Sequence, residues 1–263
     1  MSRLSDVDAF IDQSRNCDTA DDLRGIMDAI TREMGFHSYA LLQHAGRFSW
    51  SDRSHLALSS YPLAWIEYFF GHGLDSDDPV KLSSRKTGLG FSFAEMPRLI
   101  QYTHRQRRVL DAARREGITD GFAVPLHIPG EPSGTCTFIV RNGAPLPDRS
   151  FAAAQLVGGF AYEAGRRLKQ AGAPFLDRGI AARKSDRSIG SKSKRLTSRQ
   201  LDCLMLVARG KTDWETARIL GIAPETVKHH LRIVREHYGV TTRTQAAIRA
   251  ILAQDVALSD LTT

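Results

Sequence analysis

Apolar and polar positions in the last third of the chain recur with helical periodicity. The clearest pattern lies within residues 212–238, where two helical segments flank a glycine. Thr212 and Glu215 have the spacing of a capping box, in which the two side chains cap a helix start. Gly221 ends that helix, because glycine readily adopts the left-handed conformation after a helix. Pro224 then occupies the first turn of a second helix, a common place for proline.

The second helix of this pair has an apolar stripe beside a cationic one. The apolar stripe follows one helix face and consists of Val227, Leu231, Val234 and Tyr238. The cationic stripe is rotated by one residue and consists of Lys228, Arg232 and Arg235. A helix, a short turn and a cationic second helix are typical of the helix-turn-helix, whose second helix enters the major groove of DNA.

Two more capping boxes complete this region as a four-helix unit. Thr197 with Gln200 starts a helix before the pair, and Thr242 with Gln245 starts one after it. We therefore expect an all-α, four-helix helix-turn-helix domain at residues 196–263.

A linker at residues 181–195 separates this domain from residues 1–180, because the segment is Ser-rich, charged and almost free of apolar side chains. Residues 1–180 mix helical and strand periods, with two strands around a Pro-Gly turn. Helices before, between and after antiparallel strands predict an α+β fold, an α-β-α sandwich. The expected helices are 5–15, 18–34, 62–71, 104–116 and 148–169, the last capped by Asp148, and the expected strands are 37–44, 55–60, 121–128 and 134–141.

Charge is distributed unevenly between the two domains. Residues 181–263 hold 15 Lys and Arg against 8 Asp and Glu, and the rest of the chain holds 21 of each. A cationic excess confined to the helix-turn-helix region favours binding to a phosphate backbone. The alternative is a basic, solvated surface.

Composition excludes several other classes. No apolar run approaches the ~18 residues that indicate a membrane span, and the N-terminus lacks the apolar core of a signal peptide. Cys17, Cys136 and Cys203 are odd in number, far apart and without metal-ligand spacing. We expect a cytoplasmic protein without membrane contact or structural disulfide, in which Cys203 is a buried apolar residue.

The C-terminal residues that match one family pattern are Leu196, Thr197, Arg199, Leu204, Ala208, Gly210, Lys211, Thr212, Glu215, Leu220, Thr226, Val227, His230 and Leu231. With them the chain resembles the LuxR-type quorum-sensing transcription factors. One departure is Gln200, which stands where the family has Glu. Gln still completes a capping box, so we expect the fold to be kept.

A second matching set, in the N-terminal domain, consists of Tyr61, Trp65, Asp78, Pro79 and Gly121. Its spacing resembles the acyl-homoserine-lactone-binding domain of the same family. Phe69 and Phe93 replace a Tyr and a Trp of the family pattern. Aromatic walls remain but a hydroxyl and an indole are lost, which favours a less polar, slightly roomier pocket for a branched or aromatic acyl group.

The resemblance implies a role for each polar side chain of this set. Trp65 donates to the lactone carbonyl, Asp78 accepts from the amide N–H, and Tyr61 donates to the amide carbonyl, with Thr137 as a further hydroxyl partner. The chemistry agrees, because an indole only donates and a carboxylate only accepts, which fixes the polarity of the ligand. Tyr61 and Trp65, at i and i+4, would share a helix face. The alternative is that they are ordinary core aromatics.

The sequence gives little support for a metal site or a catalytic site. Asp75, Asp77 and Asp78 lack the glycine and distal glutamate of a calcium loop, so we expect no metal. Thr135 and Cys136 are expected to be strand residues only, and we find no catalytic constellation or phosphate-binding glycine loop.

The resemblance implies a ligand-responsive transcriptional regulator that is not an enzyme and needs no cofactor. An N-acyl-homoserine lactone would complete the core of the N-terminal domain, which dimerises through helix 149–169 and holds two DNA-binding modules on a palindromic operator. RNA polymerase is a further expected partner. The residues expected at base edges are Lys228 and Arg232, and those expected at the DNA backbone are Lys211, Thr226, His229 and Arg235.

Other functions remain open at this stage. The protein could be an orphan regulator that responds to another small molecule, or one that binds DNA without ligand. An enzyme fused to a DNA-binding module is disfavoured because no nucleophile is paired with a base. A phosphorylation-driven response regulator is disfavoured because the N-terminus lacks alternating β and α segments and an early acidic pair.

Overall fold

The computed structural model describes residues 3–44, 56–173, 175, 196–252 and 256. Within these residues the chain divides into two compact units, one built around a sheet and one all-helical. The linker expected at 181–195 lies outside the described residues, so the domain boundaries stay predictions. No helix in the described part of the chain is long and apolar enough to cross a membrane.

Five antiparallel strands form the sheet of the N-terminal unit. Cross-strand pairing places Thr137 opposite Ala40 on one side and opposite Ala123 on the other, which sets the register of the three central strands. In the order β2-β1-β5-β4-β3, the strands are β1 (Ser38–Gln43), β2 (Ala57–Ser59), β3 (Phe91–Ser92), β4 (Ile118–Leu126) and β5 (Gly134–Arg141).

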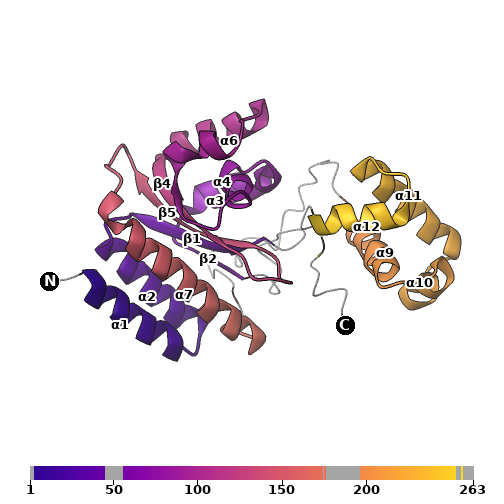
Figure 1. Ribbon diagram of the computed structural model, residues 1–263, viewed down its shortest axis with the longest axis horizontal. Coiled ribbons are helices and arrows are strands. Elements are labelled where there is room, and N and C mark those ends of the chain that lie inside the picture. The colour runs from indigo at the N-terminus through magenta and orange to yellow at the C-terminus, as the bar shows by residue number, and fades with distance from the viewer. Residues whose placement is uncertain (1–2, 45–55, 174, 176–195, 253–255, 257–263) are drawn as a thin grey trace. The chain divides into compact units, whose positions relative to one another are not determined.

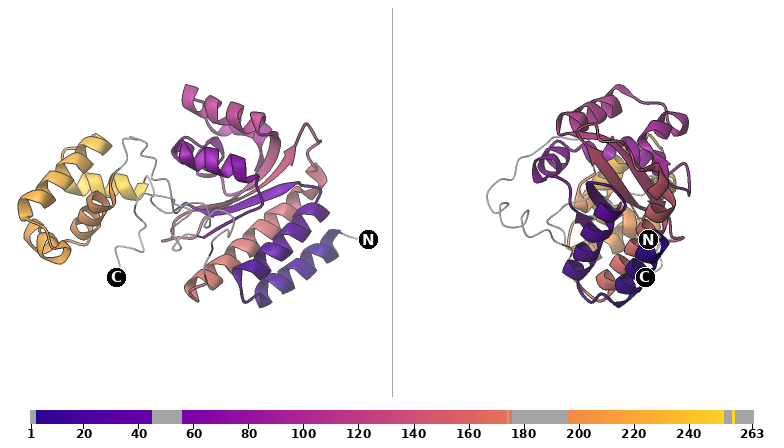
Figure 2. Two further views of the ribbon diagram at one scale, coloured as in Figure 1. Left: turned by 180° about the vertical axis from the view of Figure 1, so that it is seen from behind. Right: turned by 90° about the vertical axis from the view of Figure 1, so that its left-hand side faces the viewer.

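Helices cover both faces of this sheet, which confirms the predicted α-β-α sandwich (Figures 1 and 2). One face carries α1 (Arg3–Asn16), α2 (Ala20–Glu33) and α7 (Phe151–Gln170). The other carries α3 (Leu63–Gly71), α4 (Pro79–Ser84), α5 (Met96–Leu99) and α6 (His104–Arg115). Three 3-10 turns connect these elements: η1 (Leu74–Ser76), η2 (Phe93–Glu95) and η3 (Asp148–Ser150).

The start of the long helix α7 differs from the prediction. Asp148 was expected to cap it, but Asp148 begins the turn η3, and α7 itself starts at Phe151. Ser150 precedes the helix without capping it, because its hydroxyl donates instead to the carbonyl of Met34, 2.7 Å away. This bond ties the start of α7 to the end of α2.

The C-terminal unit has the four expected helices, α9 (Ser198–Ala208), α10 (Asp213–Leu220), α11 (Pro224–Tyr238) and α12 (Arg243–Leu252). All three predicted capping boxes form, and Gly221 ends α10 with a φ of 66°. The apolar stripe of α11 is buried at Val227, Leu231 and Val234, which pack with α9 and α10. Cys203 is fully buried here, as expected.

Substitution of two adjacent glycines of α7 tests how tightly this helix packs on the sheet. A methyl group on Gly158 would lie 3.1 Å from Cβ of Cys136 and 3.2 Å from Cβ of Val124, whereas one on Gly159 would meet no neighbouring atom within 4 Å. Ala favours a helix over Gly by about 1 kcal/mol, so Gly159→Ala should stabilise the chain. Gly158→Ala should destabilise it by about 1–3 kcal/mol, because both Cβ atoms are held by strand backbone. Urea denaturation measures both, and equal stabilities would contradict the close packing.

Candidate functional site

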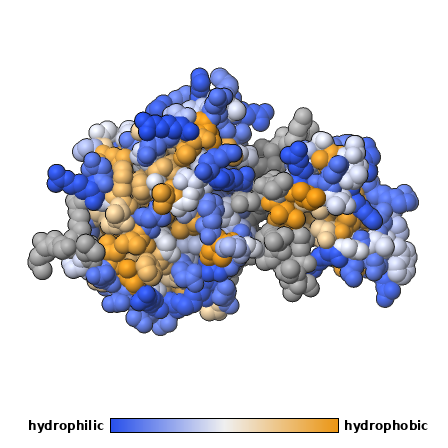
Figure 3. Space-filling view, viewed as in Figure 1, coloured by the Kyte–Doolittle hydropathy of each residue, from blue (hydrophilic) through white to orange (hydrophobic). Residues whose placement is uncertain are grey.

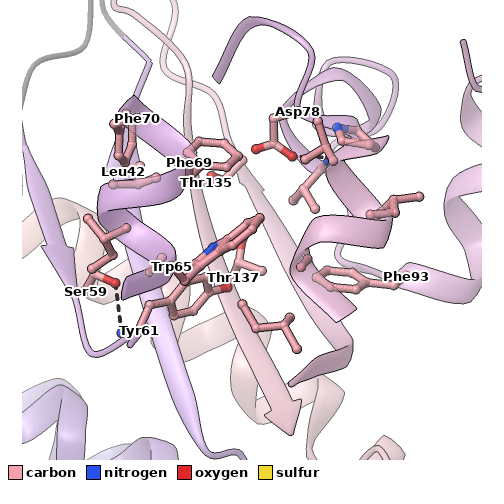
Figure 4. Close-up of a pocket in the computed structure, with 18 residues that line it drawn as sticks. Leu42, Ser59, Tyr61, Trp65, Phe69, Phe70, Asp78, Phe93, Thr135 and Thr137 are labelled. Carbon is pink, nitrogen blue, oxygen red and sulfur yellow. Dashed lines mark hydrogen bonds between the residues drawn. The ribbon is translucent and has the colours of Figure 1, made fainter. Parts of the chain in front are cut away.

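A pocket lies between the sheet and the helices α3, α4 and α6 (Figure 4). It holds about 740 Å³ of space free of protein atoms, part of which is open to solvent. Seven of the eight predicted ligand residues line it, the exception being Gly121. The full lining is Ala40, Leu42, Ser59, Tyr61, Trp65, Ile66, Phe69, Phe70, Asp78, Pro79, Val80, Phe93, Val109, Leu110, Ala113, Ile118, Thr135 and Thr137.

Tyr61 reaches the pocket from the connection between β2 and α3, and Trp65 reaches it from the first turn of α3. The sequence pattern placed both on one helix face, but α3 begins at Leu63, so Tyr61 precedes the helix. A hydrogen bond of 3.1 Å from the Tyr61 backbone N–H to the Ser59 hydroxyl fixes this turn (Figure 4). Trp65 is 6 % exposed, and its ring centroid lies 5.4 Å from that of Phe69.

Asp78 begins α4 and faces the pocket. One carboxylate oxygen accepts from the backbone N–H of Val80 at 2.9 Å, which caps the helix, and Pro79 occupies its first turn. Loss of solvation inside the protein raises the pKa of Asp78 to about 6, although the helix N–H groups and the nearby Lys81 act against this rise. Asp78 is therefore a charged acceptor held in an unfavourable setting at neutral pH.

Tyr61 is kept as a hydrogen-bond donor. Burial, and then the negative charge of Asp78, raise the pKa of the Tyr61 phenol well above its ordinary value. The phenol therefore keeps its proton at all physiological pH values. A donor and a charged acceptor thus share one apolar pocket.

Gly121 supports the pocket without lining it. A side chain on this β4 residue would lie 2.7 Å from the ring of Phe93 and 2.7 Å from the backbone oxygen of Phe138. The missing side chain therefore leaves room for the Phe93 ring, which does line the pocket. The predicted ligand contact of Gly121 is corrected to a packing role, because Gly121 faces the pocket side of the sheet but the Phe93 ring covers it.

Thr135 is a pocket residue that the sequence reading took for an ordinary strand residue. It lies two residues before Thr137 on β5, so both side chains face the same side of the sheet, toward the pocket. Its hydroxyl lies 3.1 Å from the ring Nε2 of His44, which follows β1. Strand alternation from Thr137 was the signal that could have identified Thr135.

The proposed base-reading cations lie exposed on α11 of the C-terminal unit. Lys228 pairs with Glu225 at 2.7 Å and Arg232 with Glu236 at 3.0 Å. On the face of this unit seen in Figure 3, mostly hydrophilic residues lie over α11. Exposed ion pairs within a helix contribute about 0.3–0.5 kcal/mol, so both cations can exchange carboxylate for DNA.

The residues expected to contact the DNA backbone differ in their surroundings. Lys211 and His229 are exposed, and Thr226 is half-buried at the start of α11. Arg235 donates to the carbonyl of Thr241 at 3.2 Å, which holds α11 to the start of α12. Arg235 therefore has a structural role whether or not it also meets phosphate.

Two family profiles cover the two units. The profile of the autoinducer binding domain matches residues 19–165, more than half of the chain, and that of the luxR family of bacterial regulatory proteins matches residues 194–250. The chain belongs to the LuxR family. LuxR-type proteins are autoinducer-binding transcriptional regulators with a helix-turn-helix DNA-binding domain, and they are not enzymes.

Individual LuxR-type relatives are distant. The transcriptional activator VanR of Vibrio anguillarum is 24% identical over 92% of this chain and 94% of its own length. The putative regulator y4qH of Sinorhizobium fredii is 29% identical over 73% of this chain, which spans 54% of that protein. The structure of Escherichia coli SdiA shares the fold with a TM-score of 0.53 and 18% identity, covering 97% of this chain and all of SdiA, and SdiA is also known in complex with octanoyl-rac-glycerol.

The departure from the LuxR-type pattern at Gln200 leaves local structure intact. The side-chain oxygen of Gln200 accepts from the Thr197 backbone N–H at 2.7 Å, and the Gln200 N–H donates to the Thr197 hydroxyl at 3.3 Å. The amide thus replaces the carboxylate in the capping box, as expected.

Asp78→Asn tests the charge of the pocket. The pKa of Asp78 in the folded state, about 6, exceeds its value in the unfolded chain. The folded state therefore binds the proton of Asp78 more tightly, and the free energy of unfolding of the protein falls as pH rises from about 4 to 6. Asn keeps the cap on α4 and carries no charge. Without ligand, Asp78→Asn should therefore be more stable than wild type by about 1–3 kcal/mol at pH 8, and the gain should vanish near pH 4.

Urea denaturation across this pH range provides the measurement. Asp77→Asn is the matched control, because Asp77 is a neighbouring carboxylate whose side chain is 32% exposed. Its effect should stay within about 0.5 kcal/mol at every pH. An Asp78→Asn variant that is no more stable than wild type at pH 8 would show that the carboxylate is well solvated.

Proposed function

We propose that this protein is a quorum-sensing regulator that binds an N-acyl-homoserine lactone in its N-terminal pocket and palindromic promoter DNA as a dimer. One observation carries the proposal: Asp78, Trp65 and Tyr61 converge on a pocket whose other walls are mostly apolar. Such a pocket is complementary to a ligand that has an amide flanked by apolar groups.

The three polar side chains match such an amide in number and direction. A secondary amide offers one donor, and the amide and lactone carbonyls accept. Asp78 can accept from the N–H, while Tyr61 and Trp65 can donate to the two carbonyls. Each polar group of a ligand left without a partner in a buried pocket costs about 1–3 kcal/mol. The set therefore selects this headgroup over a plain fatty acid or alcohol.

The walls of the pocket suit a bulky acyl group. Phe69 and Phe93 supply aromatic rings without the hydroxyl and indole of the usual family residues, and Phe70 and Leu42 extend the apolar surface. A branched or aromatic acyl chain fills such a space better than a thin polar one. The bound ligand would stabilise the unit by about 2.7 kcal/mol at a hundred times its dissociation constant.

The long helix α7 is the proposed dimer contact. Leu156 on α7 is 45% exposed, although it is a large apolar residue in the middle of the helix. Two copies joined here would hold two helix-turn-helix units for two half-sites of a palindrome, where RNA polymerase would be the further partner.

An orphan regulator with a different acylated ligand is the second candidate. It is favoured by the complex of SdiA with octanoyl-rac-glycerol, because an acylglycerol offers apolar chain and carbonyl but no amide N–H. In such a complex the Asp78 carboxylate would accept from a glycerol hydroxyl.

Mass spectrometry of co-purified small molecules separates the candidates. The full chain is expressed in cells supplied with a panel of acyl-homoserine lactones and acylglycerols, alongside Asp78→Asn. We expect a lactone bound to wild type and lost from Asp78→Asn, because the neutral amide oxygen loses the charge that roughly doubles the strength of the bond. Wild-type protein that carries only acylglycerol, or nothing, would contradict the lactone.

Base reading and phosphate contact make different predictions for Arg232 and Lys211. Arg232 can reach guanine O6 and N7 through two donors, so Arg232→Ala should cost about 1–3 kcal/mol on operator DNA and lower the ratio of specific to nonspecific affinity. Lys211→Ala should weaken both affinities alike and reduce the salt dependence. Titration of both variants with operator and scrambled DNA at two salt concentrations tests this. An unchanged ratio for Arg232→Ala would assign Arg232 to phosphate.

A further inference from the structure

One end of the pocket has a polar pair that the proposed headgroup contacts leave unused. His44 follows β1, and its backbone N–H continues the pairing with β5 by donating to the Ser133 carbonyl at 2.7 Å. Strand alternation places His44 on the face of Ala40 and Leu42, which both line the pocket. Its ring Nε2 lies 3.1 Å from the Thr135 hydroxyl, so His44 backs the pocket wall at Thr135.

Thr135 lies two residues along β5 from Thr137, away from Trp65 and Tyr61 (Figure 4). Thr137 lies beside Trp65 and Tyr61, whereas Thr135 lies at the Leu42 end, where Leu42 is its cross-strand partner (Figure 4). Two residues of a strand span about 7 Å. In the proposed complex, a ligand group that meets Thr135 therefore lies about 7 Å from one that meets Thr137, which places it on the acyl chain.

His44 is uncharged at neutral pH. Loss of solvation, and then the positive charges of Lys81, Arg85 and His127, lower the pKa of His44 well below 6.5. A neutral imidazole has one donor and one acceptor nitrogen. The pair is therefore a neutral hydrogen-bonding site, suited to an uncharged partner.

The hydrogen-bonding capacity of Thr135 selects the kind of partner. If Thr135 donates to Nε2, its oxygen keeps two lone pairs; if Nε2 donates, the oxygen keeps one lone pair and its own proton. With either imidazole tautomer Thr135 can accept, whereas it can donate outward with only one of them. A hydroxyl, which both donates and accepts, fits both cases, and a keto group fits one.

We propose that Thr135, positioned by His44, forms a subsite that binds a hydroxyl group on the far part of the ligand's acyl chain. The inference rests on the proposed lactone ligand and names its class: an acyl-homoserine lactone with a distal hydroxyl. Unsubstituted chains leave this pair without a ligand partner and bind less tightly.

Calorimetry with two matched probes tests the subsite. N-(ω-hydroxyhexanoyl)- and N-hexanoyl-homoserine lactone differ only in the terminal hydroxyl, and both are titrated into the full chain. Wild type should bind the hydroxylated lactone about tenfold more tightly than the plain one, which corresponds to one net hydrogen bond. Thr135→Val, which has nearly the same shape, should lose this preference, so that the two lactones bind with equal affinity.

Two control variants separate the subsite from the headgroup site. Thr135→Ser keeps the hydroxyl and should keep the preference, whereas Thr137→Val should weaken both lactones by the same factor. Equal affinity of wild type for the two lactones, or a preference that survives in Thr135→Val, overturns the subsite alone. Failure of wild type to bind either lactone overturns the proposed lactone function and the subsite with it.

Discussion

The N-terminal unit depends on a carboxylate that the protein holds where water cannot solvate it well. Asp78 caps α4 through Val80 and faces an apolar pocket, and its pKa of about 6 shows that the charge is opposed there. A carboxylate in this position favours any ligand that brings an N–H to it. Under the proposed function, ligand binding and the completion of the core would be coupled through Asp78, because a ligand N–H bonded to the carboxylate would replace the solvation that its charge lacks.

Close packing around the pocket gives this carboxylate its setting. The absence of side chains at Gly121 and Gly158 lets Phe93 lie against one face of the sheet and α7 against the other. Aromatic rings then wall the pocket, and few polar groups besides the ligand partners reach it. A lower local polarity strengthens each remaining hydrogen bond, so the same packing that stabilises the fold also sharpens recognition.

The sequence predicted the helical unit better than the pocket, for physical reasons. Capping boxes such as Thr197 with Gln200 are local, so they can be identified without the fold. The short elements α4, β3 and α5 were not predicted, because they are too short to show a period. Spacing located most pocket residues through a family pattern, but it could not show that the Phe93 ring covers Gly121 or that Thr135 lines the pocket beside Thr137. Only strand pairing brings His44 to Thr135.

Two polar regions at different depths make the pocket sensitive to where a ligand carries its oxygens. In the proposed complex Asp78, Tyr61 and Trp65 would hold the amide and lactone, and Thr135 lies about 7 Å along β5 from Thr137. A polar ligand atom that meets only the apolar side chains of the lining loses its hydration without compensation. Affinity gained at the second region therefore depends on chain length as well as on the presence of a hydroxyl. The pocket would then discriminate between related ligands by polar groups that find no partner. The contact area differs little between such ligands and would contribute little to the discrimination.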